Sequence, residues 1–212
     1  MWNSINIIDQ FFDNPSDLCE LYELALAYSR QHDLASGCCY HRTTPIESLD
    51  GECAIDRTIS HLLYSRGSSF FHGVESKIKC VEFWVNFSSP EGRPLGFHLD
   101  IDEAAFTWGS SKELDILGAL PIWSCCVHAS PREIFGGATM ISTAGVEFHN
   151  DYISSACPSL NFDEPHWVKV PYRFNRMLIF DSSYPYLVNP HESTELKVTL
   201  HMNFWDKELT KF

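Results

Sequence analysis

The feature that most constrains the fold is a change in hydrophobic periodicity after Gly73. Beyond this point short apolar segments are separated by Pro, Gly, Asn or Ser, and in the first segment apolar and polar side chains alternate. Alternation with a period of two is typical of a β-strand with one buried face. Strands are therefore predicted over 78–87, 120–127, 138–142, 168–170, 177–180, 186–188 and 196–205. A β-bulge is expected near Cys80.

The first part of the chain is predicted to be mainly helical. The apolar run 5–8 fits a first strand, and Asn14 followed by Pro15 is typical of a helix start. Apolar residues then recur at helical spacing to about Arg30. A second helix is predicted over 54–64, and the intervening residues 31–50 are predicted to be a loop. Two helices followed by many strands indicate helices packed outside a β-sandwich or barrel.

Length and composition narrow the class of protein. A chain of 212 residues is expected to form one domain, with a helical N-terminal part over about 1–75 and a barrel over about 76–206. The net charge of −13 argues against a nucleic-acid partner, because such proteins need a dense set of Lys and Arg. No long apolar run or signal-peptide pattern is present, so we expect a cytoplasmic protein with no membrane contact. The eight cysteines contain no Cys-x-x-Cys spacing, which favours reduced thiols.

The stretch 95–102 places an imidazole and a carboxylate two residues apart in an apolar, strand-like run. In an extended strand residues i and i+2 point the same way, so His98 and Asp100 are predicted to share one face. A nitrogen and an anionic oxygen that converge on one point make half of a divalent metal site. With one further histidine they would form the facial triad of a non-haem Fe(II) oxygenase.

The last predicted strand has a polar face that begins with Lys197 and Thr199. One ammonium and one hydroxyl at this spacing could bind a carboxylate. The same face could instead be exposed to solvent, and the sequence leaves both interpretations open. His201 shares that face, and His128 follows another strand, so either could line a pocket or simply be a core or surface histidine.

Several motifs together, in this order, resemble those of the 2-oxoglutarate-dependent Fe(II) oxygenases: His98-x-Asp100, Gly-Gly-Ala-Thr at 136–139, the segments 175–181 and 186–190, and Lys197-x-Thr199. The resemblance covers roughly residues 76–206. It extends more loosely to residues 7–15, an opening similar to that of prolyl-hydroxylase-like members. It implies a mostly β chain with N-terminal helices, folded as a double-stranded β-helix (jelly-roll) barrel.

The resemblance also implies cofactors and residue roles. Fe(II) would be held by His98 and Asp100 at the end of the second barrel strand, and Lys197 with Thr199 would bind the distal carboxylate of 2-oxoglutarate. The implied activity is hydroxylation or desaturation of a small molecule, an amino acid or a peptide. The different-class alternative is a catalytically degenerate barrel that binds a ligand or a protein. A third possibility is a cupin-type zinc or iron oxygenase independent of 2-oxoglutarate, against which Lys197 argues.

The third metal position departs from the family pattern. In the family a second histidine precedes the basic residue by about ten positions, and here that position is Tyr186. Three interpretations follow. Tyr186 could ligate as a phenolate if the metal lowers its pKa. A bulge could instead turn His191 inward, or the site could be degenerate.

Overall fold

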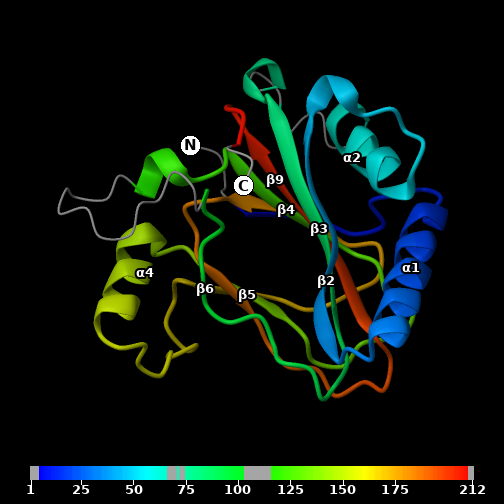
Figure 1. The fold of residues 1–212 in the computed structure, drawn as a ribbon. Coiled ribbons are helices and arrows are strands. Elements are labelled where there is room, and N and C mark those ends of the chain that lie inside the picture. The colour runs from blue at the N-terminus through cyan, green and yellow to red at the C-terminus, as the bar shows by residue number, and fades with distance from the viewer. Residues whose placement is uncertain (1–4, 66–70, 72–74, 103–115, 210–212) are drawn as a thin grey trace.

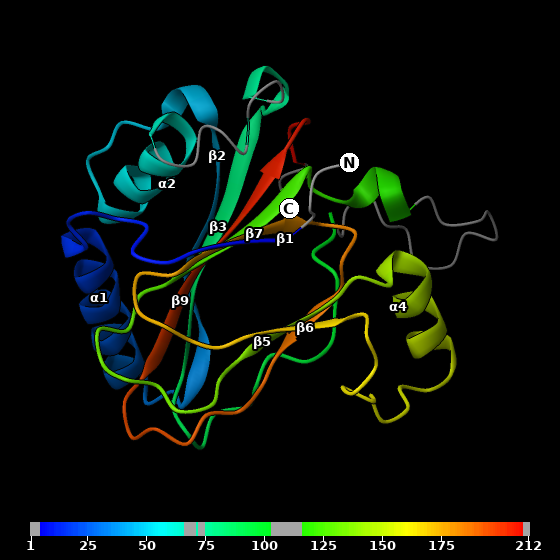
Figure 2. The same cartoon turned by 180° about the vertical axis from the view of Figure 1, so that it is seen from behind.

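The computed structural model describes residues 5–65, 71, 75–102 and 116–209. Within these residues the strands form two antiparallel sheets, which Figures 1 and 2 show from opposite sides. The larger sheet has the strand order β1-β7-β4-β9-β3-β2, and the smaller one has the order β6-β5-β8. The strands are β1 (Ile5–Ile8), β2 (Ser36–Pro45), β3 (Cys80–Ser88), β4 (Trp123–His128), β5 (Thr139–Ser142), β6 (Trp167–Val170), β7 (Met177–Asp181), β8 (Tyr186–Val188) and β9 (Lys197–Trp205).

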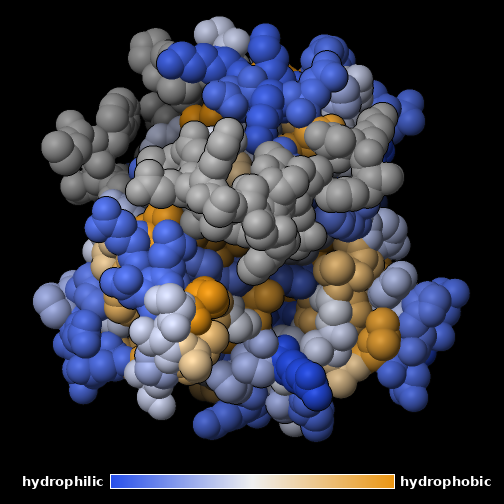
Figure 3. Space-filling model, turned by 60° about the vertical axis from the view of Figure 1, so that its left-hand side comes forward, coloured by the Kyte–Doolittle hydropathy of each residue, from blue (hydrophilic) through white to orange (hydrophobic). Residues whose placement is uncertain are grey.

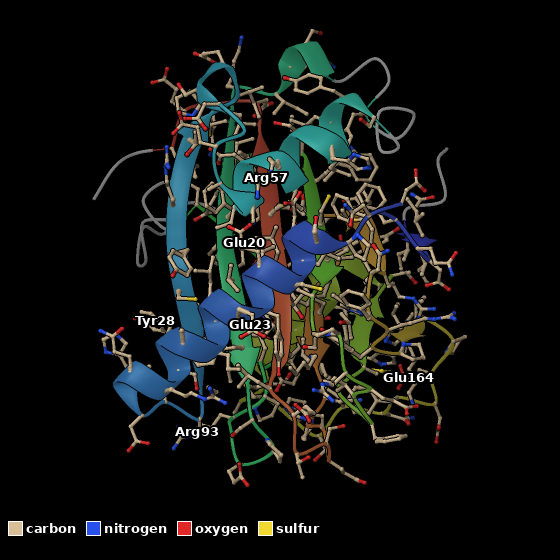
Figure 4. The ribbon with its side chains drawn as sticks, turned by 90° about the vertical axis from the view of Figure 1, so that its right-hand side faces the viewer. Glu20, Glu23, Tyr28, Arg57, Arg93 and Glu164 are labelled. Atoms are coloured by element: carbon tan, nitrogen blue, oxygen red, sulfur yellow. The ribbon has the colours of Figure 1, made fainter. Side chains whose placement is uncertain are left out.

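Two helices, α1 (Ser16–His32) and α2 (Ala54–Tyr64), cover the outer face of the larger sheet, and α4 (Gly145–Ser154) lies beside the smaller sheet (Figure 1). In Figure 4, Arg57 of α2 reaches toward Glu20 of α1. Its guanidinium lies 2.9 Å from Glu20 and 2.8 Å from Asp17. These exposed ion pairs join the two helices, and each contributes little to stability.

The main hydrophobic core lies between these helices and the larger sheet. Burial of apolar side chains here supplies most of the driving force for folding, because each fully buried Val, Leu, Ile, Phe or Met side chain contributes about 1.5–3 kcal/mol. The helices contribute Leu18, Leu21, Ile59 and Leu62, among others, and β9 contributes Val198, Leu200, Met202 and Phe204.

Strand β9 separates two environments. Its alternate residues Lys197, Thr199, His201 and Asn203 point away from the helices and are buried as well. A smaller apolar cluster occupies the space between the sheets and contains Cys126, Ile141, Val170, Leu178, Phe180 and Tyr186. The inner face of β9 is therefore polar and buried.

Most predicted elements are confirmed, with three corrections. The first strand and both N-terminal helices form, although the first helix ends at His32. The predicted loop over 31–50 is wrong, because Ser36–Pro45 pairs with β3 as an edge strand. The bulge lies in that edge strand, between Cys39 and Arg42, and β3 pairs with β9 without interruption. The helix α4 was not predicted.

The described helices include none that is long and apolar enough to span a bilayer.

Candidate functional site

His98 and Asp100 lie on a segment that runs beside β8, at the edge of the smaller sheet. The segment forms one bridge, in which His98 N–H donates to the Tyr186 carbonyl at 3.0 Å and Tyr186 N–H donates to the His98 carbonyl at 2.9 Å. The implied position at the end of a barrel strand is therefore not observed, because neither residue belongs to a strand and His98 forms only an isolated bridge. The side chains still face one another, with His98 Nε2 3.5 Å from Asp100 Oδ1.

The orientation of the His98 ring is fixed by a backbone carbonyl. His98 Nδ1 lies 2.7 Å from the Gly96 oxygen, and a carbonyl only accepts, so Nδ1 carries a proton. Burial opposes charge on this ring, but the hydrogen bond and charge of Asp100 outweigh it, so the pKa of His98 is raised. A positive charge at Nε2 is thus stabilised by Asp100, whether it comes from a proton or from a metal ion.

Tyr186, the first residue of β8, brings a third donor to the same place. Its hydroxyl lies 3.3 and 3.2 Å from the two Asp100 oxygens and donates to the carboxylate. Its ring centroid is 4.3 Å from that of His98. Burial, followed by the charge of Asp100, raises the pKa of Tyr186 well above its usual value. An imidazole, a carboxylate and a phenol therefore converge, and the phenol is neutral while no cation adjoins it.

His191 does not join this group. Its Nε2 donates to the Ser88 carbonyl at 3.0 Å, and its backbone bridges Gly136. Among the described residues, no three His, Cys, Asp or Glu side chains are close enough together to hold a metal ion. The third oxygen in contact with this pair is that of Tyr186, whose hydroxyl lies 3.2 Å from Asp100 Oδ2.

Lys197 and Thr199 line a cavity of about 180 Å³ between the sheets, so the solvent-exposed interpretation of this face is wrong. Both residues are 6% exposed. Within the described chain no carboxylate pairs with the Lys197 ammonium, whose Nζ lies 5.4 Å from the centroid of the Tyr172 ring. Burial lowers the pKa of Lys197 to about 8. Such a buried, unneutralised cation is costly, and it favours an anionic ligand.

The Gly-Gly turn before β5 makes room for this lysine. Gly137 has a φ of 61°, and a Cβ built on it would lie 3.1 Å from Lys197 Cδ and 3.3 Å from His191 Cβ. A side chain at this position would be strained and would crowd the lysine. The turn thus belongs to the wall of the Lys197 cavity.

A second cavity, of about 330 Å³, adjoins His98 and Asp100 and shares Asn86 and Leu95 with the first. Strand parity predicts which side chains of β3 and β9 line it, and the structure places Trp84, Asn86 and Asn203 there. The sequence predicts the same inward orientation for Trp123, and this is wrong, because Trp123 pairs with Phe204 and packs against the main hydrophobic core. Glu82 was missed by the sequence analysis, although its alternation with Trp84 and Asn86 is the signal that identifies it.

The two other histidines singled out in the sequence, His201 and His128, have different environments. His201 lines the Lys197 cavity, and its ring stacks on Trp84 with centroids 5.4 Å apart. Burial lowers the pKa of His201 to about 4, so its ring is neutral. His128 is a core histidine, because its Nδ1 accepts from Arg173 N–H at 3.1 Å and its ring stacks on Tyr172.

No protein-family model matches the sequence, and no curated protein is detectably similar to it. Solved structures do match. A prolyl-4-hydroxylase from Pseudomonas putida is 12% identical, with 97% of this chain and 94% of that chain covered and a TM-score of 0.62. The chain has the double-stranded β-helix fold of these oxygenases.

Two further double-stranded β-helix structures agree with this assignment. HygX from Streptomyces hygroscopicus, solved with nickel and 2-oxoglutarate bound, is 12% identical over 95% of this chain and 82% of that chain, with a TM-score of 0.57. A prolyl hydroxylase from Trichoplax adhaerens, in complex with a peptide fragment of hypoxia inducible factor, is 15% identical. It matches over 96% and 84% of the two chains with a TM-score of 0.56. The expected fold is confirmed.

Proposed function

We propose that this protein is a non-haem Fe(II)- and 2-oxoglutarate-dependent oxygenase. The observation that carries the proposal is the buried Lys197 ammonium, which has no carboxylate partner among the described residues and faces a cavity next to the His98 and Asp100 pair. The carboxylate that it lacks is what a dicarboxylate cosubstrate supplies. Thr199, on the same strand face, adds a hydroxyl donor.

The donor set fits an iron ion. His98 Nε2 and the Asp100 carboxylate are ordinary ligands of Fe(II), and the Tyr186 oxygen occupies the third position. Burial and then the Asp100 charge raise the pKa of the Tyr186 hydroxyl, and a divalent ion there would compensate that charge and lower the pKa. When bound, iron with 2-oxoglutarate supplies oxidation of a substrate C–H bond, either hydroxylation or desaturation.

The chain's own residues orient the reactants. Lys197 and Thr199 hold the far end of the cosubstrate, while the cavity lined by Trp84 and Asn203 places the substrate carbon beside His98. The Trichoplax complex contains a peptide, which supports a peptide as one substrate class, with a small molecule as the other. The 2-oxoglutarate in HygX supports the cosubstrate.

A second candidate function is a ligand-binding barrel without turnover. It is favoured by the tyrosine in the third metal position and by the lack of a third His, Asp, Glu or Cys close to the pair among the described residues. Succinate release in the presence of Fe(II), 2-oxoglutarate and candidate substrates decides between the two. Succinate formed in proportion to an oxidised product supports the oxygenase. Binding of 2-oxoglutarate without turnover across amino acid, peptide and small-molecule substrates supports the binding module.

Lys197→Met is expected to weaken 2-oxoglutarate binding about ten- to a hundredfold, because a charge-assisted hydrogen bond is worth about 1.5–3 kcal/mol. Iron content should not change, since Lys197 contacts neither His98 nor Asp100. Calorimetric titration measures the affinity, with Lys169→Met on the exposed side of β6 as the matched control. Unchanged affinity in Lys197→Met would place the anion site elsewhere.

The affinity for 2-oxoglutarate is also expected to depend on pH. The pKa of Lys197 is lowered to about 8 in the free protein, so the ammonium is present below pH 8 and lost above it. Binding of the anion favours the protonated form, and the dissociation constant should therefore rise about tenfold per pH unit above about pH 8. Titrations across this range test it. The slope should vanish in Lys197→Met, and a parent protein with pH-independent affinity would contradict the assignment.

A further inference from the structure

The cavity beside His98 contains a negative charge that the proposed reaction does not use. Glu82, Trp84 and Asn86 alternate along β3, so they share its inner face, and all three line this cavity together with Asp100. The Glu82 side chain is 19% exposed. Within the described chain no Lys or Arg side chain lines the cavity. Its fixed charge is therefore negative.

One Glu82 oxygen is available to a ligand. Oε1 accepts from His41 Nε2 at 2.9 Å, a bond that a neutral imidazole can make, and the His41 side chain is 57% exposed. Oε2 has no hydrogen-bond partner among the described residues. Burial and the Asp100 charge raise the pKa of Tyr186 most, and the Glu82 charge adds to that rise. The carboxylate thus lies within electrostatic reach of the proposed metal centre.

The two neighbouring cavities carry opposite charges. The cavity of Lys197 also includes Arg93, an exposed residue labelled in Figure 4, whereas the cavity of Glu82 has only carboxylates and neutral or histidine side chains among its described lining. The two share Asn86 and Leu95. An anionic cosubstrate is attracted to one side and repelled by the other. The opposite charges of the two cavities would therefore direct an anionic cosubstrate to the Lys197 cavity and a cationic ligand to the Glu82 cavity.

We propose that Glu82 binds a protonated amine or a guanidinium group of the substrate, in the cavity next to Trp84. The inference rests on the proposed function, because that function makes this cavity the substrate site. The Trp84 indole, which stacks on His201 and contacts His41, forms an apolar wall of the same cavity. A volume of about 330 Å³ is sufficient for a side-chain-sized group. Hydrophilic side chains cover much of the face of the molecule drawn in Figure 3, and the net charge of −13 of the chain attracts a cationic ligand.

The test compares ligands of the same shape and different charge. Pentylamine, pentanol and pentanoate are titrated into the full-length protein by ligand-observed NMR, with Nα-acetyllysine amide as a further probe. Pentylamine is expected to bind about tenfold or more tightly than pentanol, and pentanoate most weakly. The preference for pentylamine over pentanol should decrease at high salt, because the Glu82 carboxylate is partly exposed and salt screens its charge. Tighter binding of the blocked lysine than of pentylamine would indicate a peptide source, and equal binding a free amine.

Glu82→Gln keeps the shape of the side chain and removes its charge. The variant is expected to lose the preference for pentylamine over pentanol while it binds pentanol as the parent does. Glu47→Gln, on an exposed turn, is the matched control and should keep the preference. Equal binding of the three probes to the parent, or a preference retained by Glu82→Gln, would overturn the proposal.

A separate measurement distinguishes this inference from the proposed function. Titration of 2-oxoglutarate into the parent reports on Lys197 and does not depend on Glu82. A protein that binds pentylamine through Glu82 but binds no 2-oxoglutarate would refute the oxygenase and retain the cation site. A protein that binds 2-oxoglutarate but shows no preference for pentylamine would refute the cation site and retain the proposed oxygenase.

Discussion

Asp100→Ala and His98→Ala are each expected to lose tight Fe(II) binding. The site offers one imidazole, one carboxylate and one phenol, and each substitution removes one of these three donors. Loss of a residue that merely orients a ligand costs about 10–100-fold in metal affinity, so loss of a ligand itself should cost at least about a hundredfold. Metal content after equilibration with limiting Fe(II) measures the effect.

Controls separate ligation from folding. Asp102 lies two residues farther along and pairs with Lys207 at 3.0 Å, so Asp102→Ala should retain iron. Asp100→Asn keeps the volume of the side chain and its capacity to accept from Tyr186, and it should lose iron as Asp100→Ala does. Thermal unfolding confirms that each variant is folded. Retention of stoichiometric iron by a folded Asp100→Ala would remove the metal centre from this account.

Tyr186 is the second position at which a large effect is expected. If its phenolate coordinates iron, oxidation to Fe(III) should produce a charge-transfer band at visible wavelengths. Imidazole and carboxylate ligands give no such band at visible wavelengths, because they are weaker electron donors than a phenolate. Tyr186→Phe should abolish the band and weaken metal binding. Tyr186→His should bind Fe(II) at least as well as the parent, since neutral imidazole needs no proton removed from a group of high pKa.

His191→Ala provides the contrast. Its ring nitrogen Nε2 donates to the Ser88 carbonyl and lies in the wall of the Lys197 cavity, so the colour and the iron content should persist. A colourless Fe(III) protein in which Tyr186→Phe retains iron would mean that Tyr186 only holds Asp100 in place. Loss of iron in His191→Ala and not in Tyr186→Phe would contradict the register of β8 described above.

Strand parity predicted much of the arrangement on β9 but not its burial. The alternation correctly placed Lys197, Thr199 and His201 on one face. Whether that face meets solvent depends on the smaller sheet, which is built from residues 139–188 and is distant in sequence. A local pattern contains no information about which layer covers it. This explains why both interpretations of the Lys197 face were open until the structure was known.

The two missed elements have physical reasons. Strand β2 is at the edge of its sheet and is held mainly by backbone hydrogen bonds to β3, so only Cys39 and Thr44 along it are buried. Helix α4 begins at Gly145 after Ala144, which offers no side-chain cap, and none of its residues is buried, so no start signal marks it in the sequence. By contrast the helix Ala54–Tyr64 buries a continuous apolar face, and its bounds were predicted correctly.

The sequence identified two candidates for the proposed third metal ligand, Tyr186 and His191, but could not choose between them. Tyr186 occupies the expected place, and His191 follows Pro190 at an odd spacing from it. The structure keeps Tyr186 opposite His98 and directs His191 to the Ser88 carbonyl. Tyr186 can act as a ligand only when its hydroxyl loses its proton. The pKa of that hydroxyl depends on the bound metal ion as well as on the surrounding residues.

The two faces of β9 contact different parts of the molecule, and this affects how the protein can evolve. The residues that hold the helices, such as Leu200 and Phe204, and the residues that line the cavities, such as Thr199 and Asn203, alternate along one strand but belong to different layers. Substitutions on the cavity side can therefore alter ligand preference while leaving the main hydrophobic core intact. Mutational robustness and the capacity to acquire new substrates are combined in a single strand. This separation makes the double-stranded β-helix a permissive scaffold for functional divergence.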